Sequence, residues 1–154
     1  MEILSIDVGT TETGFCIINK ETYKPIRFGK ISNEDLLDIV KNEEYDTLIY
    51  EEFQSYGMPI GISTITSITW NGRYMQIALD REKKVDYIYR KEEKMNLCGS
   101  MKAKDSNIRQ ALIDRFGEVG TKRNQGWFYG FKKDIWAAYA VGVTWLDKQK
   151  ELKL

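Results

Sequence analysis

The N-terminal segment reads Glu-Ile-Leu-Ser-Ile-Asp-Val over residues 2–8 and is closed by Gly9-Thr10-Thr11. A short apolar run that is bounded by turn residues is typical of a buried strand. Residues 14–19 and 24–31 form two further runs of this kind, so an antiparallel meander is expected. Asp7 stands at the end of the first run, where an isolated carboxylate is costly to bury unless it is paired or bound to a cation.

Outward from this meander, helices and strands are predicted to alternate. Ser32-Asn33-Glu34-Asp35 is a helix start, and the helix that follows leads into a further strand at 46–51. This crossover helix is expected to join two parallel strands. The later predictions are a strand at 46–51, a helix at 63–80, strands at 85–89 and 94–98, and helices at 105–116 and 134–150. This order predicts one α/β domain over residues 1–154, with a mixed sheet and helices on both faces.

Composition excludes several classes of function. The chain has no histidine, which removes Ser-His-Asp and Cys-His catalysis and zinc sites built on histidine. Its two cysteines, Cys16 and Cys98, are too few for a disulfide framework and are expected to be small core residues. No apolar run reaches the roughly 18 residues of a membrane span, and the N-terminus lacks the layout of a signal peptide. We therefore expect a cytoplasmic protein with no membrane partner, whose chemistry rests on carboxylates.

Charge is unevenly distributed along the chain. The 23 basic and 23 acidic residues cancel, but residues 31–52 carry eight acids against one base, and residues 81–154 carry 17 bases against 10 acids. Positive charge gathered on one surface lets a neutral protein bind a polyanion. The alternative is a solvated surface of mixed charge.

Three carboxylates from separate parts of the chain are predicted to meet. Glu51 closes the strand that is parallel to the one ending in Asp7, and ligand sites in such sheets gather at the carboxyl ends of strands. Adjacent strand residues point to opposite faces, so only one of Glu51 and Glu52 can join Asp7; we favour Glu51, which directly follows the buried run, and keep Glu52 as the alternative. Asp134 opens the last helix, where the small side chain of Ala137 lets the helix approach the sheet.

Such a group of acids suits a hard divalent cation. An oxygen-only site matches Mg²⁺, with Mn²⁺ as the alternative. Paired ions can activate water and stabilise the leaving oxygen in phosphodiester hydrolysis, which needs no histidine. Asp7, Glu51 and Asp134 are therefore the predicted catalytic and metal-binding residues. Taken singly, Asp7 would cap the following turn and Asp134 would be an ordinary helix cap.

Five stretches of the chain carry a resemblance to a known family. The first is Ile-Asp-Val-Gly-Thr at residues 6–10 with Thr13-Gly14, and the others are residues 49–53, 70–73, 97–108 and 134–141. In this order they resemble the RuvC family of Holliday-junction resolvases, within the RNase H-like superfamily, and especially its bacteriophage-type members. The resemblance implies an RNase H-like fold with a five-stranded mixed sheet. It also implies a metal-dependent homodimer that nicks four-way and other branched DNA in pairs, in the host cytoplasm if the chain is phage-encoded.

One position departs from the family pattern. The family usually carries two aspartates three residues apart on its last helix, whereas here Asp134 is followed by Ala137. Another register would make Asp134 the second acid and place Phe131 at the first. Either way three acids are visible rather than four, which leaves one or two metal ions open. Asp147 lies about 20 Å further along the helix and offers no replacement.

Basic and aromatic residues are predicted to bind DNA around these acids. Basic side chains neutralise phosphates, and aromatic rings stack on or wedge between unpaired bases. Residues 127–131 are rich in aromatics, of which at least two are expected in the core. The predicted DNA-contacting residues are Phe53, Tyr56, Lys102, Lys104, Arg109, Lys122, Arg123, Lys132 and Lys133.

The long helix is the candidate dimer face. Its apolar residues are Ile65, Ile68, Met75 and Ile77. The alternative is that these side chains pack on the sheet of their own chain.

Three other functions fit parts of the pattern. A related nuclease acting on RNA or on RNA–DNA hybrids would use the same acids. A junction-binding protein with weakened cleavage would account for Ala137. A nucleotide-using enzyme of the sugar-kinase and actin superfamily shares an Asp-x-Gly-Thr-Thr loop, but it needs two such domains and gives the acidic last helix no role.

Overall fold

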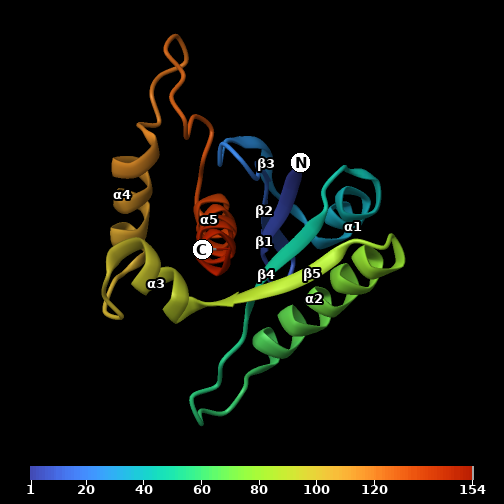
Figure 1. The fold of residues 1–154 in the computed structure, drawn as a ribbon. Coiled ribbons are helices and arrows are strands. Elements are labelled where there is room, and N and C mark those ends of the chain that lie inside the picture. The colour runs from blue at the N-terminus through green and yellow to red at the C-terminus, as the bar shows by residue number, and fades with distance from the viewer. Residues whose placement is uncertain (154) are drawn as a thin grey trace.

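The computed structural model describes residues 1–153, which form one five-stranded mixed sheet flanked by helices (Figure 1). In chain order the elements are β1 (Glu2–Asp7), β2 (Glu12–Asn19), β3 (Pro25–Ser32), α1 (Asn33–Asn42), β4 (Thr47–Glu52), α2 (Ile62–Asp80), β5 (Lys84–Tyr89), α3 (Arg90–Cys98), α4 (Asp105–Phe116) and α5 (Asp134–Leu152). The strand order is β3-β2-β1-β4-β5. The first three strands form the predicted antiparallel meander, and β4 is parallel to β1 and β5 to β4. The predicted α/β architecture is confirmed.

Helices cover both faces of the sheet, and each face has its own core. On β1, Leu4 and Ile6 face α1 and α2, whereas Ile3 packs in the core that contains α5. This division follows from the alternation of side chains along a strand. Helices α3 and α4 pack against α5 on its far side from β3 and β2, as Figure 1 shows.

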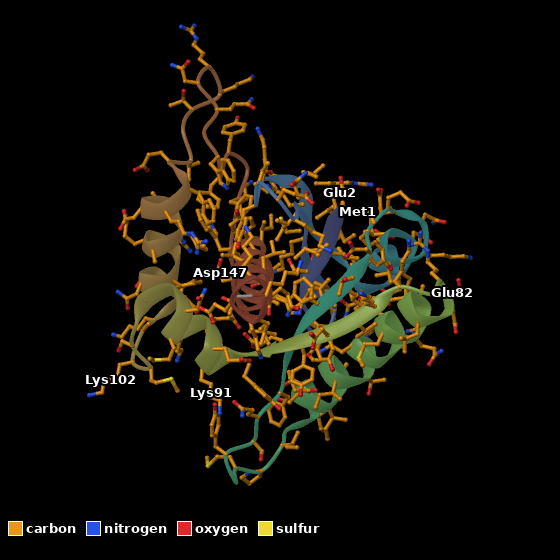
Figure 2. All side chains as sticks on the ribbon, viewed as in Figure 1. Met1, Glu2, Glu82, Lys91, Lys102 and Asp147 are labelled. Atoms are coloured by element: carbon orange, nitrogen blue, oxygen red, sulfur yellow. The ribbon has the colours of Figure 1, made fainter. Side chains whose placement is uncertain are left out.

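Helix α5 is the central element of its layer. Eleven of its 19 residues are buried, and Gly142 lets it lie close to the sheet, because a Cβ there would stand 2.4 Å from Ile18. Asp147 fixes α5 to its neighbours (Figure 2). It accepts two hydrogen bonds from the Arg115 guanidinium, each of 2.8 Å, and one of 2.7 Å from the Tyr23 hydroxyl. These contacts give Asp147 a structural role.

The expected strand at residues 94–98 is wrong, because this segment is the C-terminal half of helix α3. The helix is composed mainly of good helix formers. At its start the Tyr89 amide donates to the Glu92 carboxylate at 2.8 Å, and at its end Gly99 adopts a left-handed conformation with φ of 68°. Of the apolar residues in this segment, Leu97 and Cys98 pack partly buried on the neighbouring core, whereas Met95 is exposed.

Two expectations from composition agree with the structure. Cys16 is fully buried, and Cys98 packs partly buried at the core of the α5 layer. Phe128 and Phe131 are buried as well, so at least two aromatics of residues 127–131 belong to the core as predicted. Within residues 1–153 none of the helices combines the length and apolar character needed to cross a bilayer.

Candidate active site

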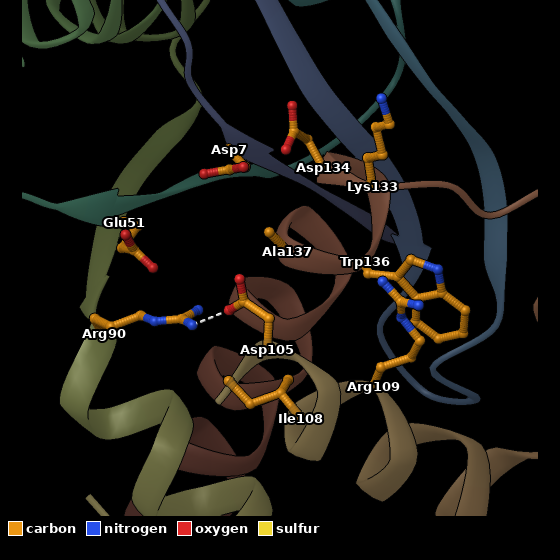
Figure 3. Close-up of a pocket in the computed structure, with 10 residues that line it drawn as sticks. All are labelled: Asp7, Glu51, Arg90, Asp105, Ile108, Arg109, Lys133, Asp134, Trp136 and Ala137. Atoms are coloured by element: carbon orange, nitrogen blue, oxygen red, sulfur yellow. Dashed lines mark hydrogen bonds and ion pairs between the residues drawn. The ribbon is translucent and has the colours of Figure 1, made fainter. Parts of the chain in front are cut away.

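A cavity of about 440 Å³ opens where β1 and β4 end, beneath the first turn of α5 (Figure 3). Helices α3 and α4 form its opposite wall. The acidic residues that line it are Asp7, Glu51, Asp105 and Asp134. The structure therefore brings together the three carboxylates singled out in the sequence, and it adds a fourth from α4.

The parallel register of β1 and β4 places Asp7 beside Glu51. Ile6 is paired with Tyr50, so the residue after each strand partner stands at the same edge and on the same face. Glu52 points to the opposite face, where its carboxylate accepts hydrogen bonds from the Tyr50 hydroxyl at 3.2 Å and from the Phe53 amide at 3.0 Å. The structure thus selects Glu51 as the partner of Asp7.

A close backbone approach holds Asp134 over the first residues of β2. A Cβ on Gly14 would lie 2.5 Å from the Asp134 carbonyl oxygen, so only glycine allows α5 to start at this height. Asp134 is the first residue of α5, and its carboxylate pairs with the Lys30 ammonium at 2.9 Å. The N-cap of α5 is Lys133, so Asp134 is not the helix cap that was the alternative interpretation of the sequence.

A buried polar network fixes the turn that follows Asp7. The Thr13 hydroxyl donates to the Asn33 side-chain oxygen at 2.6 Å, and the Asn33 amide donates to the Gly9 carbonyl at 3.0 Å. The Tyr74 hydroxyl, from α2, donates to the Asn33 backbone carbonyl at 3.0 Å. The end of β1 is thereby tied to both helices on the other face of the sheet.

Burial and the neighbouring acids together raise the proton affinity of Asp7. Burial, followed by the negative charges of Glu51 and Asp134, raises its pKa to about 7. A carboxylate that is costly to ionise without a counter-charge is stabilised by a bound cation. The Lys30 ammonium partly neutralises the nearby Asp134 carboxylate, which in turn raises the pKa of Lys30.

Sequence reasoning missed three residues of this site, which are Arg90, Glu93 and Asp105. The Arg90 guanidinium forms an ion pair with Asp105 at the cavity mouth and lies 3.7 Å from the Glu93 carboxylate. Glu93 is fully buried, and neither of its oxygens accepts a hydrogen bond from the described residues. Burial raises its pKa, and the carboxylate of Glu51 raises it further. Arg90 and Glu93 stand three residues apart, and this helical spacing was the available signal.

The donor chemistry fits a hard divalent ion. The cavity presents carboxylate oxygens, and the unpartnered oxygens of buried Glu93 lie behind Glu51. Across residues 1–153, however, no three acids are preassembled as a metal site. Asp134 and Asp105 are instead paired with Lys30 and Arg90. When bound, a divalent ion would supply an activated water and stabilise the leaving oxygen.

Ala137 occupies the place on α5 where a further acid would enter the cavity. It lies one turn beyond Asp134 and lines the same wall (Figure 3). Asp147, committed to its hydrogen bonds with Arg115 and Tyr23, does not replace it. The cavity is therefore lined by the three predicted acids and by Asp105, which reaches it from α4 rather than from α5.

Three of the predicted DNA-contacting residues lie at the site itself. Arg109 and Lys133 line the main cavity, and the Arg109 guanidinium lies 5.5 Å from the centre of the Trp136 ring. Phe53 lines an adjoining hollow that also contains Asp7. These side chains can contact a phosphate or a base that approaches the acids.

The other predicted DNA-contacting residues are exposed but do not line the cavity. Tyr56 lies in the loop between β4 and α2. The rest are the basic side chains Lys102, Lys104, Lys122, Arg123 and Lys132. Lys122 and Arg123 belong to residues 117–133, a segment that projects from the top of the molecule in Figure 1. At its base, Trp127 stacks on Phe116 with ring centres 5.4 Å apart.

Comparisons with known proteins identify the fold. A scan with protein-family models and a search of curated protein sequences gave no match. Among solved structures, Thermus thermophilus RuvC matches with a TM-score of 0.73 and 13% identity over 98% of this chain and 97% of its own. T. thermophilus RuvC in complex with a Holliday junction substrate gives 0.70 and 13% over 94% and 92%. The yeast mitochondrial Holliday junction resolvase Ydc2 gives 0.61 and 12% over 98% and 81%. The chain has the RNase H-like fold of the RuvC-type Holliday junction resolvases.

Proposed function

We propose that this protein is a metal-dependent endonuclease that resolves four-way and other branched DNA junctions by paired nicking. The observation that carries the proposal is the meeting of Asp7, Glu51 and Asp134 in one cavity at the carboxyl ends of β1 and β4. It is supported by the fold, which is shared with a RuvC structure in complex with a Holliday junction substrate. Mg²⁺ is the proposed cofactor, with Mn²⁺ as the alternative.

The surroundings of the cavity suit a branched polyanion. Arg109 and Lys133 place positive charge beside the acids, where phosphates would approach. The basic segment of residues 117–133 and the loop of residues 53–61 extend from opposite ends of the molecule (Figure 1). Duplex arms could therefore contact both extensions while a strand at the branch point enters the cavity. Tyr56, 71% exposed at the second extension, is placed to stack on an unpaired base.

Paired nicking requires two sites, so we also propose a homodimer. Ile65 and Ile68 on the N-terminal half of α2 are 52% and 41% exposed. Met75 and Ile77, on the other half, pack on the sheet. The C-terminal half of α2 therefore packs on the sheet of its own chain, which was one alternative for this helix. The exposed N-terminal half is the proposed contact between chains.

The test is cleavage of a labelled synthetic four-way junction with Mg²⁺ or Mn²⁺. Linear duplex and an RNA–DNA hybrid serve as competing substrates. Asp7→Asn is the inactive variant, and Asp38→Asn, at an exposed carboxylate of α1, is its matched control. Paired nicks that are lost only in Asp7→Asn support the proposal.

Two results would redirect the proposal. Preferential cutting of the hybrid would assign the chain to the nucleases that act on RNA. Tight junction binding without cleavage under either ion would favour a binding protein, a function for which Ala137 is the specific observation.

A further inference from the structure

We propose that the Arg90 guanidinium takes the place of a second divalent ion, so that each site works with one metal ion and one fixed positive charge. This inference rests on the proposed nuclease function and deepens it. It assigns Arg90 as a catalytic residue that contacts the scissile phosphate, and it makes Asp105 and Glu93 positioning residues.

The contacts of Arg90 are those expected of a cation within an acidic site. Its guanidinium lines the cavity, pairs with Asp105 at the mouth and lies 3.7 Å from Glu93 at the back. Its charge also acts on Asp7 and Glu51. One side chain therefore partly neutralises acids from β1, β4, α3 and α4.

Glu93 explains why this charge is built into the fold. Its carboxyl group is fully buried, and Arg90 is the one basic group that lies within 4 Å of it among residues 1–153. A buried acid needs a counter-charge or a proton, and removal of its partner is strongly destabilising. The Arg90 guanidinium thus lies between buried Glu93 on the protein side and exposed Asp105 on the solvent side, and these two acids hold it in position.

Ala137 accounts for the weak binding of a second ion beside Arg90. The methyl side chain contributes no ligand on the cavity wall that faces α3 and α4. A divalent ion entering there would meet the guanidinium, a charge of its own sign, with fewer oxygen ligands to offset the repulsion. The positive charge of Arg90 therefore takes the place of the second ion that an acid at position 137 would help to bind.

Arginine suits the chemistry because its planar fork can donate two hydrogen bonds to one phosphate. In the proposed step a water oxygen bonds to phosphorus as the bond to the leaving sugar oxygen breaks. The products are a phosphate monoester and a free hydroxyl, and the water supplies both the added oxygen and the proton taken up by the leaving group. Negative charge grows on the phosphate oxygens, where a preorganised donor is most effective.

The first experiment counts Mn²⁺ ions bound to the full chain by electron paramagnetic resonance, without DNA. One tight ion per chain is expected for the wild type and for Ala137→Asp, because Arg90 remains in place. Two are expected for the double variant Arg90→Met/Ala137→Asp. Two tight ions in the wild type or in Ala137→Asp alone would overturn the proposal, as would one ion in the double variant. This count requires no cleavage, so it is separate from the test of the proposed function.

The second experiment measures single-turnover cleavage of the four-way junction. Arg90→Met is expected to slow cleavage by about 10²–10³-fold with its Mn²⁺ affinity retained, and Arg90→Lys to recover part of the loss. Arg27→Met, at an exposed ion pair with Glu43, is the matched control and should cut as the wild type does. Because loss of Arg90 leaves Glu93 without a counter-charge, Arg90→Met/Glu93→Gln is measured beside it. Cleavage within twofold of wild type in either folded variant would refute the role of Arg90.

Discussion

Replacing Asp7 with asparagine is expected to stabilise the metal-free protein at neutral and alkaline pH while it abolishes cleavage. The pKa of this carboxyl rises from 3.8 to about 7 on folding. A difference of about 3 pKa units at about 1.4 kcal/mol each puts the cost of ionising Asp7 in the folded state at up to about 4 kcal/mol. Asparagine has the shape of the neutral carboxyl and carries none of this cost.

The sign of the effect depends on pH in a defined way. Below about pH 4 the carboxyl is protonated in both the folded and the unfolded chain, and the free energy of unfolding bears no penalty. Between about pH 4 and pH 7 the folded chain holds a proton that the unfolded chain has released, so wild-type stability falls as pH rises. Above about pH 7 the penalty is complete and constant.

The assay is urea unfolding in a chelator across this pH range, for wild type, Asp7→Asn and the control Asp38→Asn. The stability gap between Asp7→Asn and wild type should widen up to pH 7 and then level off. Saturating Mn²⁺, at about 100 times its Kd, should stabilise the wild type by about 2.7 kcal/mol and Asp7→Asn far less. A gap that does not change with pH would refute the electrostatic reasoning. Equal stabilisation of the two proteins by Mn²⁺ would remove Asp7 from the metal site.

Other consequences of the structure can be tested in the same way. Lys132→Ala with Lys133→Ala should weaken junction binding and lower the slope of log affinity against log salt by about 2, measured by fluorescence anisotropy in chelator; an unchanged slope would remove this segment from the interface. Gly14→Ala should cost roughly 1–3 kcal/mol of unfolding free energy, because its Cβ would meet the backbone of the last helix at 2.5 Å, whereas Gly72→Ala, in open space, should gain up to about 1 kcal/mol. Ile65→Asp should convert the proposed dimer to monomer in analytical ultracentrifugation with its circular dichroism unchanged, and a persistent dimer would place the interface elsewhere.

The sheet and its two strand-end acids were predictable because they depend on simple alternation. Short apolar runs between turn residues defined the strands, and the crossover helix before residues 46–51 predicted a parallel pair, which the structure shows for β1 and β4. Period-two geometry then allowed only one of Glu51 and Glu52 to face Asp7. The same alternation places successive residues of β1 in the two cores, one on each face of the sheet.

The other half of the site was not predictable in this way. Arg90 and Glu93 lie in a charge-rich helix whose pattern resembles a solvated surface, and part of that helix was predicted to be a strand. Asp105 was predicted only as the first residue of a helix at 105–116. These residues become a site because α3 and α4 pack against each other and against α5. That packing is tertiary, and no local sequence pattern encodes it.

The hydrogen bonds of Asn33 have a consequence for when the site is ready to act. They connect the turn behind the first acid to Tyr74, on the same helix that carries the exposed contact face. In the proposed dimer, a second chain would contact the helix that these hydrogen bonds join to the turn after β1. A lone chain that cut would leave a single nick and an unresolved crossover. In the proposed dimeric nuclease, this network would therefore link formation of the dimer to the position of Asp7.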